Sequence, residues 1–167
     1  VAAAVAFAHR EAATYGGDPA RLFVSGHSAG AYNAVMVASA PQFLRAEGVS
    51  PNIIAGVAGI SGPYDFLPSD NPAVIALFAP TSDKEATQPV NLVSADTPPM
   101  LFIHGLKDTV VFRHNAENMK AALRDAGVRA EIIYYPEADH ADTLIGIAWP
   151  RRTGTIADMI AFFESVD

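Results

Sequence analysis

Residues 21–30 read RLFVSGHSAG, a short apolar run that stops at a serine held between two glycines. The part Gly26–Gly30 matches G-x-S-x-G, the pattern of a sharp turn from a strand into a helix. The context agrees with the pattern, because Arg21–Ser25 is a short buried-strand candidate and Ala29–Ala40 reads as a helix of small side chains. The stretch therefore predicts a serine exposed at the end of a strand.

Ser28 is the residue that this turn would expose. Such a turn strains the backbone of the serine, so the residues two positions away should lack side chains that collide, a demand that Gly26 and Gly30 meet. The backbone N–H of Ala29, at the start of the helix, is placed to hold a developing oxyanion. A hydroxyl is a poor nucleophile at neutral pH, so Ser28 as a nucleophile requires a histidine base and an acid that orients it.

Further apolar runs alternate with helical patterns along the chain. Ile53–Ile60 is continuous and β-branched at several positions, as in a strand buried on both faces. Met100–His104 and Ala130–Tyr135 are further strand candidates. Alternating strands and helices imply right-handed crossovers, and they predict an α/β fold with a parallel sheet and helices on both faces. Helices are expected over residues 1–15, 29–40, 114–126 and 153–163, and loops around a short helix over residues 68–99.

An acid and a base follow the later strands in the order that the turn requires. Asp108 lies four residues beyond His104 in HGLKDTVV, and His140 ends the segment PEADH after the fourth strand. In an open parallel sheet, the loops after the strands meet at one edge. The order Ser28, Asp108, His140 therefore predicts a catalytic triad at the carboxyl ends of the strands.

These motifs resemble a known superfamily. GHSAG, together with ISGPYDF and HGLKDTVV, is similar to the esterase, lipase and arylformamidase-like branch of the α/β-hydrolases. The resemblance covers residues 1–167 as a single domain, the C-terminal portion of that fold, and implies cleavage of a small-molecule ester through an acyl-enzyme. In that reading Ser28 attacks the acyl carbon, His140 shuttles the proton and Asp108 fixes the histidine tautomer. It implies no metal and no organic cofactor.

Two other functions stay open. An amidase or arylformamidase would use the same acyl chemistry with a different leaving group. In the family, strands upstream of the nucleophile strand carry a loop, often His-Gly-Gly-like, that donates a second oxyanion N–H. The sequence holds no such segment, so we expect the strand Arg21–Ser25 to lie at an open edge that a homo-oligomer or a complementing N-terminal segment covers. A catalytically incomplete fragment is therefore the second alternative.

Other polar residues compete for the triad positions. Asp65 in SGPYDF also follows a strand, but a turn-capping role suits it better than that of the acid. His114 lies only six residues from Asp108 at a predicted helix start, where a solvated or capping histidine is expected. His104, at a strand end, is expected to be a packed core histidine.

The candidate substrate pocket is assigned from position along the chain. Tyr64, Phe66 and Leu67 follow the second strand near the expected cleft mouth, where they either line a pocket or pack under a loop. Trp149 is either a pocket wall or an anchor for the last helix. His27 is a further pocket candidate, with a structural position beneath the turn as the alternative.

Composition excludes several classes of function. A formal net charge of −7 argues against a nucleic-acid partner, which would require a basic face. No cysteine is present, so disulfides, thiolate nucleophiles and cysteine-ligated metals are excluded. The five acidic residues between Asp125 and Asp142 have no metal-ligand spacing. No apolar run approaches the ~18 residues of a membrane span. The chain reads as soluble, and its cell compartment stays open with the cytoplasm slightly favoured.

Overall fold

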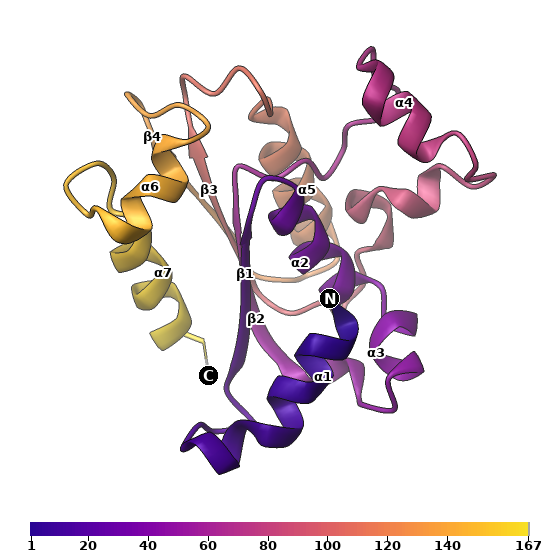
Figure 1. Ribbon diagram of the computed structural model, residues 1–167, viewed down its shortest axis with the longest axis vertical. Helices are drawn as coiled ribbons and strands as arrows, with labels where there is room; N and C mark the ends of the chain where they lie inside the picture. The colour runs from indigo at the N-terminus through magenta and orange to yellow at the C-terminus, as the bar shows by residue number, and fades with distance from the viewer. Residues whose placement is uncertain (167) are drawn as a thin grey trace.

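The computed structural model describes residues 1–166, and within them four parallel strands form one sheet (Figure 1). The strands are β1 (Leu22–His27), β2 (Ile54–Ile60), β3 (Met100–Gly105) and β4 (Ala130–Tyr135), and their order in the sheet follows the chain. The predicted α/β architecture with a parallel sheet is confirmed. Because all four strands run the same way, the loops that follow them gather at one edge.

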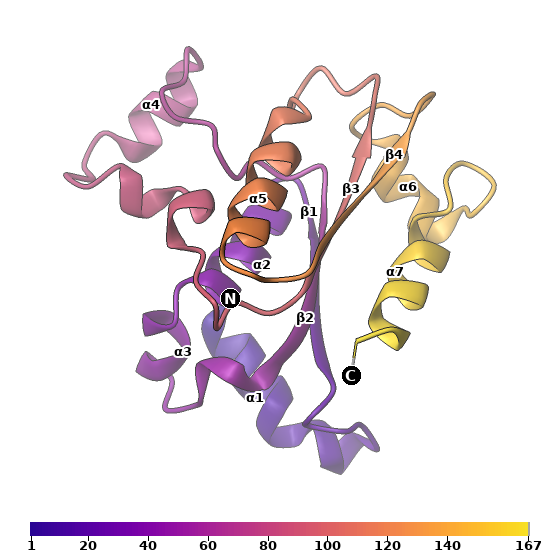
Figure 2. The same cartoon turned by 180° about the vertical axis from the view of Figure 1, so that it is seen from behind.

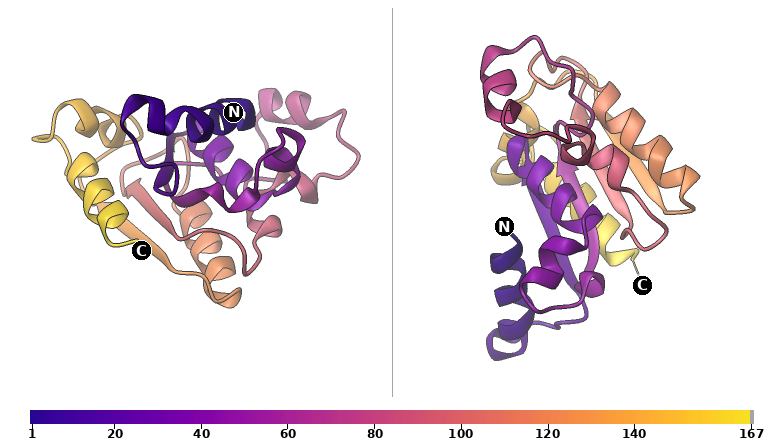
Figure 3. Two further views of the ribbon diagram at one scale, coloured as in Figure 1. Left: turned by 90° about the horizontal axis from the view of Figure 1, so that it is seen from below. Right: turned by 90° about the vertical axis from the view of Figure 1, so that its right-hand side faces the viewer.

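Helices cover both faces of this sheet, as Figures 2 and 3 show. Helices α2 and α5 pack on one face, and α6 and α7 lie on the other. The seven α-helices among residues 1–166 are α1 (Ala2–Glu11), α2 (Ala29–Ser39), α3 (Gln42–Ala46), α4 (Pro72–Phe78), α5 (His114–Asp125), α6 (Asp142–Ala148) and α7 (Thr155–Glu164). Short 3₁₀ helices are η1 (Ala12–Tyr15), η2 (Pro51–Ile53), η3 (Glu85–Thr87) and η4 (Pro89–Leu92).

Strand β3 shows why the central runs are apolar without alternation. Met100 and Phe102 belong to the core beneath α2 and α5, whereas Leu101 and Ile103 belong to the core beneath α7. All six residues of this strand are buried. Side chains of successive strand residues point to opposite faces, so a strand covered on both faces is apolar throughout.

The structure differs from the sequence prediction in the helices. The first predicted helix is divided into α1 and the 3₁₀ helix η1, and Val1 at its start is 62% exposed. Helices α3 and α6 were not predicted, since five and seven residues are too few for a clear helical period. Helix α4 stands away from the sheet (Figure 1) in the segment for which loops around a short helix were predicted.

Strand β1 forms one edge of the sheet among the described residues, as expected. Its partner is β2, with Leu22 paired to Ile54 and His27 paired to Ile60. That a second copy or another segment covers this edge stays a prediction. No helix within residues 1–166 combines the length and the apolar composition needed to cross a membrane.

Candidate active site

Ser28 lies at the turn between β1 and α2 in a conformation that few non-glycine residues adopt. Its φ is 55° and its ψ is −123°. The backbone N–H of Ser28 donates to the carbonyl oxygen of Ile60 at 2.9 Å, which fixes the turn to the end of β2. Strained backbone held by its surroundings is common at functional sites. The strained serine expected from the sequence is therefore present.

The two glycines of the motif have different roles. A Cβ added to Gly26 would lie 2.3 Å from both the carbonyl carbon and the oxygen of Gly30, so no side chain fits at Gly26. A Cβ added to Gly30 would have no atom within 4 Å. The prediction that Gly30 must lack a side chain is wrong, because among the described residues there is open space where its side chain would lie.

This contrast predicts opposite effects of two matched substitutions. Gly26→Ala is expected to lower the free energy of unfolding by about 1–3 kcal/mol, as overpacking against backbone does. Gly30→Ala is expected to raise the free energy of unfolding by up to about 1 kcal/mol, because alanine is the better helix former. Urea denaturation measures both. Equal effects of the two substitutions would contradict this account of the turn.

Asp108 and His140 come together from the loops after β3 and β4. The Nδ1 atom of His140 lies 2.7 Å from Oδ2 of Asp108, whose side chain is fully buried. The other carboxylate oxygen accepts the backbone N–H groups of Val110 and Val111, each at 2.9 Å. Burial alone would raise the pKa of the Asp108 carboxyl, but the N–H of Val111, His140 and the N–H of Val110 outweigh it, so the net pKa is lowered.

Close backbone contact between the two loops explains this pairing. The N–H of Lys107 donates to the carbonyl oxygen of Ala138 at 3.0 Å. A Cβ added to Gly105 would lie 2.3 Å from that same oxygen, so the approach requires glycine. The loop with Asp108 therefore lies directly against the loop with His140.

Ser28 lies at the same edge of the sheet as this pair. Within residues 1–166 no hydrogen bond joins the Ser28 hydroxyl to His140. The neighbouring residue makes the connection, because Nε2 of His27 lies 2.8 Å from the backbone oxygen of His140 and the two rings are 4.6 Å apart. Since Asp108 engages Nδ1 of His140, Nε2 is the ring atom left to accept a proton.

The rival residues have other partners. Oδ2 of Asp65 accepts a hydrogen bond from Asn118 at 2.7 Å, and its backbone oxygen lies 3.2 Å from Nε2 of His114 at the start of α5. His104 is buried, and its Nε2 donates to the backbone oxygen of Val111 at 2.9 Å. His104 is therefore the packed core histidine that the sequence predicted.

The two partly or fully buried histidines predict a pH dependence of stability. Burial lowers the pKa of His104 and of His27 from the ordinary 6.5. Below about pH 7 the unfolded chain binds protons that the folded chain does not, so the free energy of unfolding should fall as the pH drops. Urea denaturation at about pH 7.5 and about pH 5.5 measures this fall.

A matched variant separates His104 from the other groups. His104→Gln keeps a donor for the oxygen of Val111 but cannot take up a proton, so the fall should be smaller than in the parent chain. An identical fall in both proteins would show that protonation of His104 in the unfolded chain does not contribute to the fall, contrary to this account.

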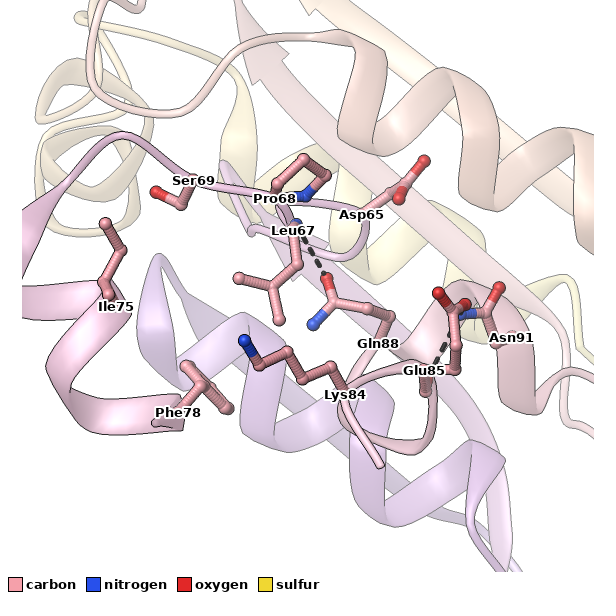
Figure 4. Close-up of a pocket in the computed structure, with 10 residues that line it drawn as sticks. All are labelled: Asp65, Leu67, Pro68, Ser69, Ile75, Phe78, Lys84, Glu85, Gln88 and Asn91. Carbon is pink, nitrogen blue, oxygen red and sulfur yellow. Dashed lines mark hydrogen bonds between the residues drawn. The ribbon is translucent and has the colours of Figure 1, made fainter. Parts of the chain in front are cut away.

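A groove of about 900 Å³ begins beside the turn. Tyr32, Phe66 and Phe78 form an aromatic cluster in its wall, with ring centroids 5.4 to 6.5 Å apart. Phe66 and Leu67, two of the candidate pocket residues, line it, and that this groove binds substrate stays a prediction. Among its lining residues are Ala29, Tyr32, Phe66, Leu67, Phe78 and Phe112. A second hollow of about 370 Å³ shares Leu67, Pro68 and Phe78 with it, and Figure 4 shows the residues that line this hollow.

Three pocket predictions are wrong in the described structure. Tyr64 is 1% exposed and packs against Phe102 in the core, in the space that Gly59 and Gly62 leave for its phenol. Trp149 is 70% exposed, caps the C-terminal end of α6 and lies outside the groove. His27 is turned toward the backbone of His140 and does not line the groove.

Two buried amides that the sequence reading missed hold the groove wall in place. Oδ1 of Asn115 accepts the backbone N–H groups of Tyr64 and Asp65, both at 2.8 Å. Oε1 of Gln88 accepts those of Phe66 at 2.9 Å and Leu67 at 3.3 Å, the latter drawn in Figure 4. Four successive N–H groups are satisfied in this way. No local sequence signal marks these amides, because their partners are distant in the chain.

No group of three His, Asp or Glu side chains within residues 1–166 is arranged to hold a metal ion. The candidate site therefore consists of a strained serine, an acid and histidine pair, and a largely apolar groove.

Comparison with known proteins assigns this arrangement to a family. The model of the prolyl oligopeptidase family matches residues 2–166. The chain belongs to the prolyl oligopeptidase family. Curated proteins that resemble the chain include Esterase LipQ of Mycobacterium tuberculosis, 28% identical over 98% of the chain and 42% of the esterase. Esterase LipC of the same organism is 30% identical over 98% of the chain and 44% of the esterase.

Solved structures agree on the fold. A truncated carbohydrate esterase from gut microbiota superimposes with a TM-score of 0.77 at 24% identity, covering 98% of the chain and 65% of that protein. Esterase 2 of Thermogutta terrifontis phosphoramylated by tabun gives 0.75 at 20% identity, covering 99% and 63%. The predicted resemblance to the α/β-hydrolase esterases is confirmed, and the chain spans less than half the length of LipQ and LipC.

Proposed function

We propose that this chain carries the catalytic centre of a serine hydrolase that cleaves carboxylic esters of small molecules. The observation that supports this most is the 2.7 Å hydrogen bond between Asp108 and His140, made at the same sheet edge as the strained Ser28. A buried carboxylate paired to a histidine, together with a serine at the same sheet edge, is the arrangement that activates a hydroxyl for acyl transfer. The esterase names of the relatives LipQ and LipC point to the same reaction class.

The proposed reaction passes through an acyl-enzyme. Ser28 Oγ attacks the carbonyl carbon of the ester while its proton moves to Nε2 of His140. The tetrahedral intermediate expels the alcohol, whose oxygen takes the proton back from His140. Water then attacks the acyl group on Ser28 with the same proton relay, which releases the acid and restores the serine.

Asp108 has two tasks in this scheme. Its hydrogen bond keeps the proton of neutral His140 on Nδ1, so that Nε2 is free to accept from Ser28. Its negative charge also stabilises the imidazolium that forms after proton transfer. Because Val110 and Val111 already donate to its other oxygen, the carboxylate is fixed in the orientation that serves both tasks.

Ala29 is proposed as one donor of the oxyanion hole. It is the first residue of α2, so its N–H has no acceptor within the helix, and it lies at the positive end of the helix dipole. It also lines the groove. A second donor is expected from the complementing segment or partner copy that the sequence predicts, because one N–H provides only part of the usual stabilisation.

Amide hydrolysis is the alternative, and the family name gives it a specific basis. Parallel assays with p-nitrophenyl butyrate, an aryl formamide and an amino-acyl p-nitroanilide distinguish the two. We expect kcat/KM to be highest for the ester, because p-nitrophenolate is a better leaving group than an amine, which must take a proton from His140 before it leaves. A higher kcat/KM for either amide substrate would favour an amidase.

A further inference from the structure

We infer that His27 is a positioning residue that holds the general base in place by donating a hydrogen bond to the backbone carbonyl of His140. The inference rests on the proposed role of His140 as the base. His27 directly precedes the nucleophile, yet it lies outside the groove and is turned toward the histidine loop, with Nε2 at 2.8 Å from the carbonyl oxygen. Its role is therefore exerted through His140 rather than through the substrate.

The carbonyl oxygen of His140 has two donors. One is Nε2 of His27 at 2.8 Å, and the other is the hydroxyl of Thr143 at 3.1 Å. The Thr143 oxygen also lies 3.1 Å from the hydroxyl of buried Ser61, which can donate to it. A hydroxyl has one proton to give, so Ser61 donates to Thr143 and Thr143 donates to His140. Both lone pairs of this carbonyl are thus engaged.

The two donors differ in what they connect. Thr143 is three residues from His140, so its bond shapes the histidine loop locally. His27 is 113 residues away and ends β1, so its bond ties the nucleophile turn to the base loop. A displacement of about 1 Å between reacting groups can cost about 100-fold in rate. His27 is therefore placed to control the Ser28–His140 distance.

The charge state of His27 suits this role. Burial lowers the pKa of its ring, although the bond to the His140 carbonyl and the charge of Asp108 oppose that effect. His27 is thus neutral near pH 7, with its proton on Nε2, where the carbonyl requires it. A cationic ring 4.6 Å from His140 would repel the imidazolium formed during catalysis. A neutral donor fixes the base without this penalty.

Two variants of His27 test the inference. His27→Leu removes the donor and puts an apolar side chain in its place. His27→Gln places an amide N–H near the position of Nε2. We expect His27→Leu to lower kcat for p-nitrophenyl butyrate by about 10- to 100-fold with KM changed less than about 3-fold. His27→Gln should recover kcat to within about 5-fold of the parent. Parent-like kcat in His27→Leu, or equal losses in both variants, would overturn the inference.

A second measurement does not depend on activity. The proton on Nδ1 of His140, held by Asp108, should give a low-field NMR resonance that disappears in His140→Ala. We expect it to persist in His27→Gln and to broaden or vanish in His27→Leu, because the loop loses its long-range bond. An unchanged resonance in His27→Leu would refute positioning by His27. If the parent chain hydrolyses no ester, the proposed function fails, and this resonance still decides the role of His27.

Discussion

Ser28→Ala is expected to reduce kcat/KM for p-nitrophenyl butyrate by about 10³- to 10⁶-fold, the range seen when a triad nucleophile is removed. Alanine has no oxygen to form the acyl-enzyme, so only background stabilisation by the site would remain. The measurement is a steady-state assay of parent and variant at equal concentrations of folded protein.

A neighbouring serine provides the matched control. Ser25 lies on the same strand, and its hydroxyl is within 4.0 Å of the sulfur of Met159, on the α7 side of the sheet. Ser25→Ala should keep kcat/KM within about 3-fold of the parent, as surface substitutions away from a site usually do. Retention of more than a tenth of the activity in Ser28→Ala would show that another residue is the nucleophile.

Asp108→Asn is the second substitution with a large expected effect. The asparagine oxygen can still accept the N–H groups of Val110 and Val111, so the loop should keep its shape. Its amide would then donate to Nδ1 of His140 and force the ring proton onto Nε2, where it blocks proton transfer from Ser28. We expect kcat to fall by about 10⁴-fold, as for the wrong tautomer in other triads.

Asp65 is the acid against which this result must be compared. It follows β2 and accepts from Asn118, with no bond to His140 among the described residues. Asp65→Asn should therefore lower kcat by less than about tenfold. A larger loss in Asp65→Asn than in Asp108→Asn would exchange their roles.

The sequence was informative where local pattern determines structure. The apolar runs that became β2 and β3 predicted the strand bounds to within one residue, because strands covered by helices on both faces are apolar throughout. The half-buried strand β4 has the predicted bounds Ala130–Tyr135. The acid and histidine pair was also predictable, since parallel strands bring the loops that follow them to one edge. The contact between Asp108 and His140 follows from that topology.

Contacts between distant segments could not be predicted in this way. Tyr64 follows β2 in a position that suits a pocket residue, but two glycines open a space in the core that its ring fills. The bond from His27 to the His140 carbonyl spans 113 residues and leaves no periodic signal. Side-chain direction at the end of a strand depends on packing, and a single sequence does not specify it.

The most direct test of the account is covalent labelling of the chain with a fluorophosphonate, which reacts with activated serines. Mass spectrometry of the digested product should find one adduct, on the peptide that contains Ser28. The adduct should be absent in Ser28→Ala and formed at least about 100-fold more slowly in Asp108→Asn. An adduct on another residue, or none on folded parent protein, would contradict the claim that Ser28 is the nucleophile.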